Sequence, residues 1–300
     1  DSIHILNIDT LEYSLKSTDI FAQGFRLTHK YKNKNKNLYD VAVPRLHLKS
    51  KNLSSFSLSD SLEIQFLEFE NAQIQFYQKD TPQKLKVELI NQFNLYSLVE
   101  NQFSEIKIDS LILTNAILKI FQQPDSVNYQ QIFKDLTITL DKFELDSTSA
   151  KNKSKIFHAD NISMTVNGYQ LKLQDNAHEF NADSMFISTF SNSLGVKGIQ
   201  ILPTTTAENK NRTQVNVSCA GLKISDVNLK TIYHTRTIPT RYITVDSPEI
   251  LLEYHSEIAK NTKDRETGLL FELISAYLKG VYSEVVEINK GSLSIQTFNN

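Results

Sequence analysis

The chain has 300 residues, of which 40% are hydrophobic and 22% charged, so it can form a real core in one large domain or two ordinary ones. Its formal net charge of −2 gives no electrostatic basis for binding nucleic acid, and the single cysteine, Cys219, excludes an internal disulfide. Only 8 glycines and 6 prolines are present, so we expect Asn, Asp, Ser and Lys to form most turns.

Strands dominate the prediction along the whole chain, because apolar residues alternate with mostly polar ones. A strand of this kind has one dry face and one wet face. The alternating sets are, in chain order, Ile3/Ile5, Leu11/Tyr13/Leu15, Ile64/Phe66, Ile74/Phe76, Leu118/Ile120, Met164/Val166, Leu171/Leu173, Met185/Ile187, Ile199/Ile201, Val215/Val217 and Leu293/Ile295. About twenty strands are expected, whereas open sheets rarely exceed ~10 without curling or splitting. The dry faces must therefore be covered.

A finer spacing, with apolar residues two, three and two apart, recurs four times. It occurs at Val41/Val43/Leu46/Leu48, Ile106/Ile108/Leu111/Leu113, Ile138/Leu140/Phe143/Leu145 and Leu222/Ile224/Val227/Leu229. The two central residues keep both halves on one face, which either a two-residue hairpin or a β-bulge would achieve. Both geometries remain open for the pairs Asp109-Ser110 and Asp141-Lys142, whereas Pro44-Arg45 favours a bulge.

Two amphipathic helices interrupt the strands, at about 82–103 and 265–282. Leu89, Phe93 and Tyr96 lie on one stripe of the first, and Leu270 and Ile274 on one stripe of the second. We expect both helices to lie on the sheet. An interfacial membrane helix is the alternative, but neither stretch has the Lys/Arg-rich polar face that anionic membranes favour. No transmembrane span or signal peptide is predicted, and the strand-like start at Asp1 suggests a piece of a longer protein.

The chain repeats itself in order. Ser104-Glu105-Ile106 is echoed by Ser283-Glu284-Val285, and the stretch 7–11 is echoed by 181–185 at a similar offset. Between these anchors, Ile64/Phe66 matches Ile243/Val245. We therefore predict a first β repeat unit over 1–122, connecting strands of the same sheet over 123–180, and a second repeat unit over 181–300.

No catalytic constellation is found in the sequence. The seven histidines show no HxxxH or HExxH spacing, and there is no GxSxG, Walker or GxGxxG motif. We expect a buried structural role for Cys219. The chain is thus predicted not to be an enzyme and to need no metal or cofactor; a site assembled from distant loops is the weaker alternative.

One motif resembles a known family. The run Ile-x-Ile-Asp-Ser-Leu-x-Leu-x-Asn-Ala-x-Leu-x-Ile at 106–120 resembles the repeats of AsmA-like proteins of bacterial envelopes, a group related to TamB and, more distantly, to bridge-like lipid-transfer proteins. The resemblance implies a taco-shaped antiparallel sheet whose apolar inner face carries acyl chains between membranes. It also implies no catalytic residues, and an N-terminal membrane anchor that is not predicted in this sequence.

The predicted fold is therefore mostly β: a long curved antiparallel sheet, groove-like or taco-like, with about two amphipathic helices. The predicted function is a lipid-binding groove segment of a larger cell-envelope protein in lipid transport or outer-membrane biogenesis. Its expected partner is phospholipid or another acyl-chain lipid. We expect a periplasmic location, with membrane contact through parts of the protein outside this chain. The alternative is a structural or adhesive surface β-protein with a closed core and no ligand. Ten residues are predicted to line the groove: Ile64, Phe66, Ile74, Phe76, Ile106, Ile108, Leu118, Ile120, Ile243 and Val245.

Overall fold

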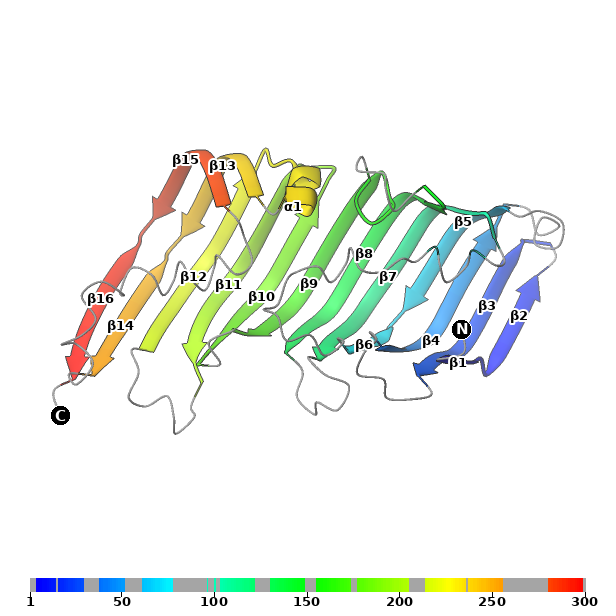
Figure 1. The fold of residues 1–300 in the computed structure, drawn as a ribbon, viewed down its shortest axis with the longest axis horizontal. Coiled ribbons are helices and arrows are strands. Elements are labelled where there is room, and N and C mark those ends of the chain that lie inside the picture. The colour runs from blue at the N-terminus through cyan, green and yellow to red at the C-terminus, as the bar shows by residue number, and fades with distance from the viewer. Residues whose placement is uncertain are drawn as a thin grey trace. The chain divides into compact units, whose positions relative to one another are not determined.

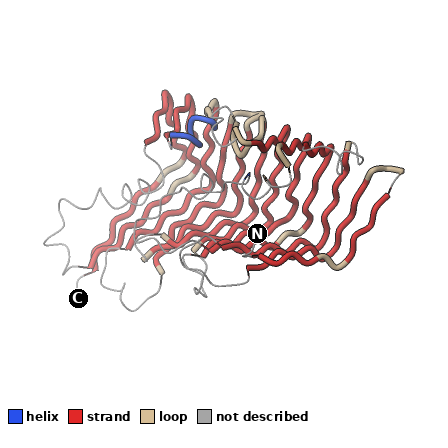
Figure 2. Tube along the Cα trace, turned by 45° about the vertical axis from the view of Figure 1, so that its right-hand side comes forward, coloured by secondary structure: helices blue, strands red, loops and turns tan. Residues whose placement is uncertain are grey.

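The computed structural model describes residues 4–14, 16–29, 38–51, 61–77, 96, 100, 103–121, 130–148, 155–173, 177–204, 214–235, 237–255 and 280–298. As predicted, this part of the chain is mostly β, and Figure 2 shows its strands in red and one short helix in blue. Two compact units form: unit 1 is Asp1–Val166 with Ser188–Phe190, and unit 2 is Asn167–Ile187 with Ser191–Asn300. The predicted repeat boundaries at 122 and 181 stay predictions.

Unit 1 is a sheet in which β1, β3, β4, β5, β7, β8 and the start of β9 follow one another (Figure 1). β2 also pairs with β3, and β6 pairs with both β4 and β7. The strands are β1 (His4–Asn7), β2 (Thr10–Ser14), β3 (Asp19–His29), β4 (Leu38–Ser50), β5 (Ser61–Glu70), β6 (Gln73–Tyr77), β7 (Glu105–Phe121), β8 (Gln131–Asp146) and β9 (Asn161–Lys172), the last of which runs on into unit 2.

Unit 2 contains the rest of β9 and a sheet in which β10, β11, β12, β13 and β15 follow in order (Figure 1). β14 also pairs with β12, and β16 pairs with β14. Its elements are β10 (His178–Ser188), β11 (Ser193–Pro203), β12 (Gln214–Ser225), α1 (Leu229–Thr235), β13 (Thr237–Asp246), β14 (Glu249–His255), β15 (Gly280–Asn289) and β16 (Ser292–Phe298).

The sheet is mixed, so the prediction of an antiparallel sheet is wrong at one place in each unit. β5 and β6 both pair with β7 in parallel, and β13 and β14 pair in parallel with β15 and β16. Parallel neighbours need a crossover connection of a dozen or more residues. The long segments 78–104 and 256–279, which precede β7 and β15, are long enough to make these crossovers.

The two predicted helices fall largely on these crossovers and mostly outside the described residues. Within the first, the amide of Glu100 donates to the carbonyl of Tyr96 at 2.9 Å, which is one helix-like turn. The end of the second prediction is wrong, because Gly280, Val281 and Tyr282 already belong to β15 and pair with β13. The rest of both helices stays a prediction.

The two-three-two spacing lies on continuous strands in unit 1. β4, β7 and β8 each run through their pattern without a hairpin, and Lys142 adopts a left-handed φ of 55° opposite Asp109. In unit 2 the same spacing has another outcome. β12 ends at Ser225, the left-handed Asp226 turns the chain, and Asn228 Oδ1 accepts from the amide of Thr231 at 3.1 Å to cap α1. The prediction of a strand through Leu229 is therefore wrong.

The two units share a local pairing plan, by which we mean that equivalent strands pair in the same register and carry left-handed residues at equivalent positions. In unit 1 the left-handed Asn71 donates its amide to the carbonyl of Thr114 at 2.9 Å, and in unit 2 the left-handed Ser247 donates to that of Asn289 at 2.7 Å. The offset along the chain from Asn71 to Ser247 is nearly the same as the offset from Thr114 to Asn289. Two further pairs of left-handed residues are related by nearly this offset, namely Gly24 with Gly198 and Asn115 with Lys290.

Candidate lipid-contacting face

Three rows of apolar side chains cross five neighbouring strands of unit 1. Each row is a set of residues directly opposite one another in β3, β4, β5 or β6, β7 and β8. Row 1 is Ile20, Leu48, Leu67, Leu111 and Leu140. Row 2 is Ala22, Leu46, Phe69, Leu113 and Ile138. Row 3 is Leu27, Val41, Ile74, Leu118 and Phe133.

Rows 1 and 2 lie on the same side of the sheet, which we call the apolar face. Their members are two residues apart on every strand, and residues at that spacing point the same way. Between row 2 and row 3 the strands carry left-handed residues at Gly24, Asn71, Asn115 and Asp135. Such interruptions act as bulges that insert a residue, and row 3 accordingly lies five residues from row 2 rather than an even number.

Most members of the rows are only half-buried. All five residues of row 3, and all residues of row 1 except Leu140, are half-buried. Apolar side chains that stay partly exposed in contiguous rows form the kind of patch that usually marks an interaction site. The apolar face is therefore the strongest candidate binding surface in the part of unit 1 that the structure describes.

The opposite side of the same strands carries ion pairs and hydrogen bonds, although Phe21 and Ile112 lie there too. Arg45 Nη1 pairs with Glu70 Oε1 at 3.6 Å, and Thr114 Oγ1 donates to Glu68 Oε1 at 3.1 Å. His47 Nε2 lies 2.9 Å from Asp19 Oδ1, and this hydrogen bond lowers the pKa of Asp19. A sheet with one charged side and one apolar side is built to face water on the first and something apolar on the second.

Unit 2 carries rows at equivalent positions. The counterpart of row 1 is Leu194, Ile224, Ile243 and Val286; that of row 2 is Val196, Leu222, Val245 and Ile288; and that of row 3 is Ile201, Val217, Ile250 and Leu293. On each strand or strand pair, the three members repeat the spacing of their unit 1 counterparts, as Leu194, Val196 and Ile201 repeat that of Ile20, Ala22 and Leu27. Ile243 and Val245 are thus the counterparts of Leu67 and Phe69, rather than of Ile64 and Phe66, with which the sequence match paired them.

The structure distributes the ten predicted lining residues over three environments. The buried ones are Ile64, Phe76, Ile108, Ile120 and Ile243. The half-buried ones on apolar rows are Ile74, Leu118 and Val245, and Ile106 is half-buried between Leu62 and Leu145. Phe66 differs from the rest, because it stands opposite Lys49 and Ser110, and its ring lies 5.3 Å from that of His47, on the polar side.

Eight half-buried residues of rows 1 and 2 in unit 1 are missing from the predicted set: Ile20, Leu46, Leu48, Leu67, Phe69, Leu111, Leu113 and Ile138. The signal for five of them was present, because the two-three-two spacing contains Leu46, Leu48, Leu111, Leu113 and Ile138. Leu67 and Phe69 follow the bulge at 64–66, where β5 slips against β4. That slip moves the apolar positions from even to odd numbers, which alternation from Ile64 could not anticipate.

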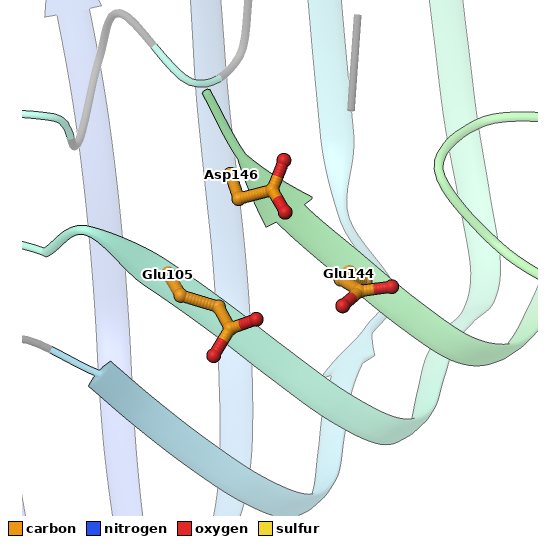
Figure 3. Close-up of side chains that lie close together, drawn as sticks. All are labelled: Glu105, Glu144 and Asp146. Atoms are coloured by element: carbon orange, nitrogen blue, oxygen red, sulfur yellow. The ribbon is translucent and has the colours of Figure 1, made fainter. Parts of the chain in front are cut away.

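One polar cluster lies apart from the apolar rows (Figure 3). Glu105 of β7 and Glu144 and Asp146 of β8 bring one carboxylate oxygen each within 4.8 Å of the others. Lys107 Nζ pairs with Glu105 at 2.7 Å, which raises the pKa of Lys107, and Lys155 Nζ pairs with Glu144. Two lysines therefore balance much of the negative charge, and ion pairing accounts for the cluster without a bound cation.

Cys219 is buried, as predicted, and its thiol lies 3.2 Å from the carbonyl oxygen of Gly221. Among the described residues, no helix has the length and apolar character to cross a membrane.

Comparison with known proteins found no matching family model and no matching curated protein. Among solved structures, the chain is similar to LptH from Pseudomonas aeruginosa, described as the LptA-homologous periplasmic component of the lipopolysaccharide transport device. The match covers 74% of this chain and 75% of LptH, at 5% identity and a TM-score of 0.12. A TM-score this low does not show a shared fold, so nothing about the function of this chain is inferred from LptH.

Proposed function

We propose that this chain is a non-enzymatic, acyl-chain-binding segment of a larger cell-envelope protein in lipid transport or outer-membrane biogenesis. Phospholipid, or another lipid with long acyl chains, is the proposed ligand. Its tails lie along rows 1 to 3, and its head group stays in water. A periplasmic location, with membrane contact through other parts of the protein, belongs to the same proposal.

The observation that supports it is the continuity of the apolar rows. A ligand that must move along a sheet needs a surface that is alike from strand to strand, and each row repeats apolar side chains over five strands. Burial of acyl chains contributes about 0.8 kcal/mol per CH₂ group without any specific polar contact. Half-buried rows can therefore hold a chain in many registers, which suits transfer better than a closed pocket.

We further propose that the two units arose from one duplicated pairing plan. The equivalent registers and left-handed residues support this, because unrelated sheets would not repeat the same row spacing on four strands in the same chain order. Duplication supplies a second set of apolar rows with the same strand pairing, as repetition does in other repeat proteins. A closed structural β-protein would gain nothing from leaving such rows half-exposed.

The test is lipid capture by the purified chain and by face-specific variants. Native mass spectrometry after expression in bacteria should detect co-purified phospholipid, and NBD-labelled stearate should bind saturably. Phe69→Asp places a charge on the apolar face and should lower probe affinity at least tenfold. Glu68→Asn changes its half-buried neighbour on the polar side and should leave the affinity unchanged.

Circular dichroism and thermal melts establish that each variant is folded. Should Phe69→Asp unfold, Leu67→Trp fills space on the same face without a charge, and we expect it to displace lipid. A lipid-free monomer that ignores the probe, in its wild-type form, would instead indicate a closed structural β-protein.

A further inference from the structure

The outer edge of β15 and β16 differs from its counterpart in unit 1. Val286, Ile288, Leu293 and Ile295 are 57%, 62%, 63% and 63% exposed. Their counterparts in β7, which are Leu111, Leu113, Leu118 and Ile120, are half-buried or buried. The two sets of residues are all apolar, and they pair in equivalent registers with the strands that precede them. The difference in exposure must therefore come from what lies along the outer edge, on the side away from those preceding strands.

In unit 1 that other side is occupied by β8. β8 runs antiparallel to β7 and continues the rows, with Leu140 opposite Leu111, Ile138 opposite Leu113 and Phe133 opposite Leu118. Within the part of the chain that the structure describes, β15 pairs only with β13 and β16 only with β14. No described strand therefore occupies the outer backbone N–H and C=O groups of β15 and β16, which can accept a partner strand.

The bulge in this edge adds a specific requirement. In β7 the left-handed Asn115 turns its amide toward β8, where Thr137 Oγ1 accepts it at 3.4 Å. Lys290, between β15 and β16, is left-handed in the same way, with φ of 57°. A strand that pairs with both β15 and β16 must pass this bulge and accept a hydrogen bond from its amide. In unit 1 the hydroxyl of Thr137 accepts the equivalent hydrogen bond.

The charges on the described residues of this edge do not interrupt its apolar rows. Exposed edge strands in natural proteins carry inward-pointing charges, prolines or a covering segment. Glu284, Glu287 and Lys290 supply charge here, but Glu287 stands opposite Thr244, outside the apolar rows. The three residues of this edge that lie on the rows are all apolar, namely Val286, Ile288 and Leu293. An apolar edge in register with an established strand interface is a template for one more strand.

We propose that the β15–β16 edge is a docking site for an extended segment with the pattern of β8. The segment runs antiparallel to β15 and β16. It places apolar side chains opposite Val286, Ile288 and Leu293, and a threonine or serine beside the amide of Lys290. This proposal goes beyond lipid binding and stands or falls independently of it, because it concerns the edge and backbone of the sheet rather than the ligand on its face.

The chain itself supplies the probe, a fluorescein-labelled peptide of residues 131–146. Titration of the whole chain into this peptide, followed by anisotropy, should give saturable binding. A peptide carrying Ile138→Lys and Leu140→Lys has charges on rows 2 and 1, and we expect it to bind at least tenfold more weakly. On the protein, Ile288→Lys with Leu293→Lys changes only exposed side chains and should weaken binding at least tenfold. Glu287→Lys adds a matched positive charge off the rows and should not.

Hydrogen exchange locates the bound peptide. The proposal requires new amide protection within Gly280–Phe298. Protection confined to Glu105–Phe121 would mean exchange with the chain's own β8, and it would overturn the proposal, as would absence of binding. Self-association that depends on Ile288 and Leu293 and that the peptide cannot compete away would assign the edge to a second copy, and it would overturn the proposal too.

Discussion

β7 of unit 1 and the β15–β16 pair of unit 2 place similar apolar residues in equivalent registers, yet these residues are buried or half-buried in β7 and exposed in β15 and β16. Ile120 of β7 stands opposite Phe76 and is 6% exposed, whereas Ile295 of β16 stands opposite Leu252 and is 63% exposed. The identity of the residue is the same in both places. We therefore attribute the burial of Ile120 to β8, the strand that follows β7 in the sheet. Ile295 stays exposed because no described strand follows β16 in the same way.

The largest expected effect comes from truncating this isoleucine in each unit. Ile120→Ala should lower the free energy of unfolding by about 2–4 kcal/mol, because it leaves a cavity in a packed site. Ile295→Ala removes the same atoms from an exposed site and should cost less than about 1 kcal/mol. Urea unfolding followed by circular dichroism measures both. Equal losses would mean that the edge is packed in solution, contrary to the comparison.

A second pair of substitutions tests whether the two units are equivalent at positions away from the open edge. Gly24 and Gly198 are left-handed, with φ of 64° and 60°, and a Cβ at either would come within 2.0 Å of a carboxylate oxygen, of Asp9 and Asp183 respectively. Gly24→Ala and Gly198→Ala should each cost about 1–3 kcal/mol, because a strained backbone adds to displacement of the aspartate. The two losses should match within about 0.5 kcal/mol if the plans are equivalent. A large loss at one site and none at the other, in thermal melts of both variants, would argue against a shared plan.

A smaller effect distinguishes an ion pair inside the sheet of unit 1 from its counterpart at the open edge of unit 2. Lys51 and Lys142 hold the Asp109 carboxylate at 2.9 and 3.0 Å and lower its pKa below the ordinary 3.8. A carboxyl with a lowered folded pKa stabilises the fold above its unfolded pKa, and this stability is lost as the pH falls through the lowered value. Asp109→Asn should therefore cost about 0.5–1 kcal/mol at pH 7 and little below pH 3.

Glu284 is the counterpart of Asp109 at the open edge, and its partner Arg241 lies 3.4 Å away with both side chains more than half exposed. Glu284→Gln should change stability by less than about 0.5 kcal/mol at any pH. Denaturation series at pH 7 and pH 3 measure both variants. A pH-independent loss at Asp109 would show that packing, rather than the two lysines, explains its contribution.

The smallest effect belongs to the turn that follows β8. His158 occupies a left-handed position, accepts the Glu144 amide through its carbonyl at 2.9 Å, and lies edge-on to Phe143. Burial lowers the pKa of His158 below its ordinary 6.5, so the unfolded chain binds the proton more readily. Stability should fall slightly as the pH drops below 6.5. His158→Asn keeps a residue that tolerates left-handed backbone and should remove this slope in melts between pH 8 and pH 5.

The sequence predicts the one-faced strands well, because alternation and pleat have the same period. The two-three-two spacing in β7 and β8 likewise contains Leu111 and Leu140, which stand opposite each other in row 1. The parallel pairing of β5 with β7 could not be predicted from the sequence, because apolar and polar residues alternate in the same way in parallel and antiparallel strands. The candidate site was predicted only in part for the same kind of reason. Ile120 and Ile295 read alike in the sequence, and only the presence of a neighbouring strand separates them.

The most direct test of the central claim is photo-crosslinking at four consecutive residues of β5. Leu67 and Phe69 point to the apolar face, Glu68 and Glu70 to the polar side, and all four are half-buried. With p-benzoylphenylalanine placed singly at each position in bacterial cells, mass spectrometry of the purified protein should find phospholipid adducts at 67 and 69 and none at 68 and 70. Adducts at all four positions, or at none, would contradict the account, because lipid would then either coat the sheet without regard to its faces or not bind there at all.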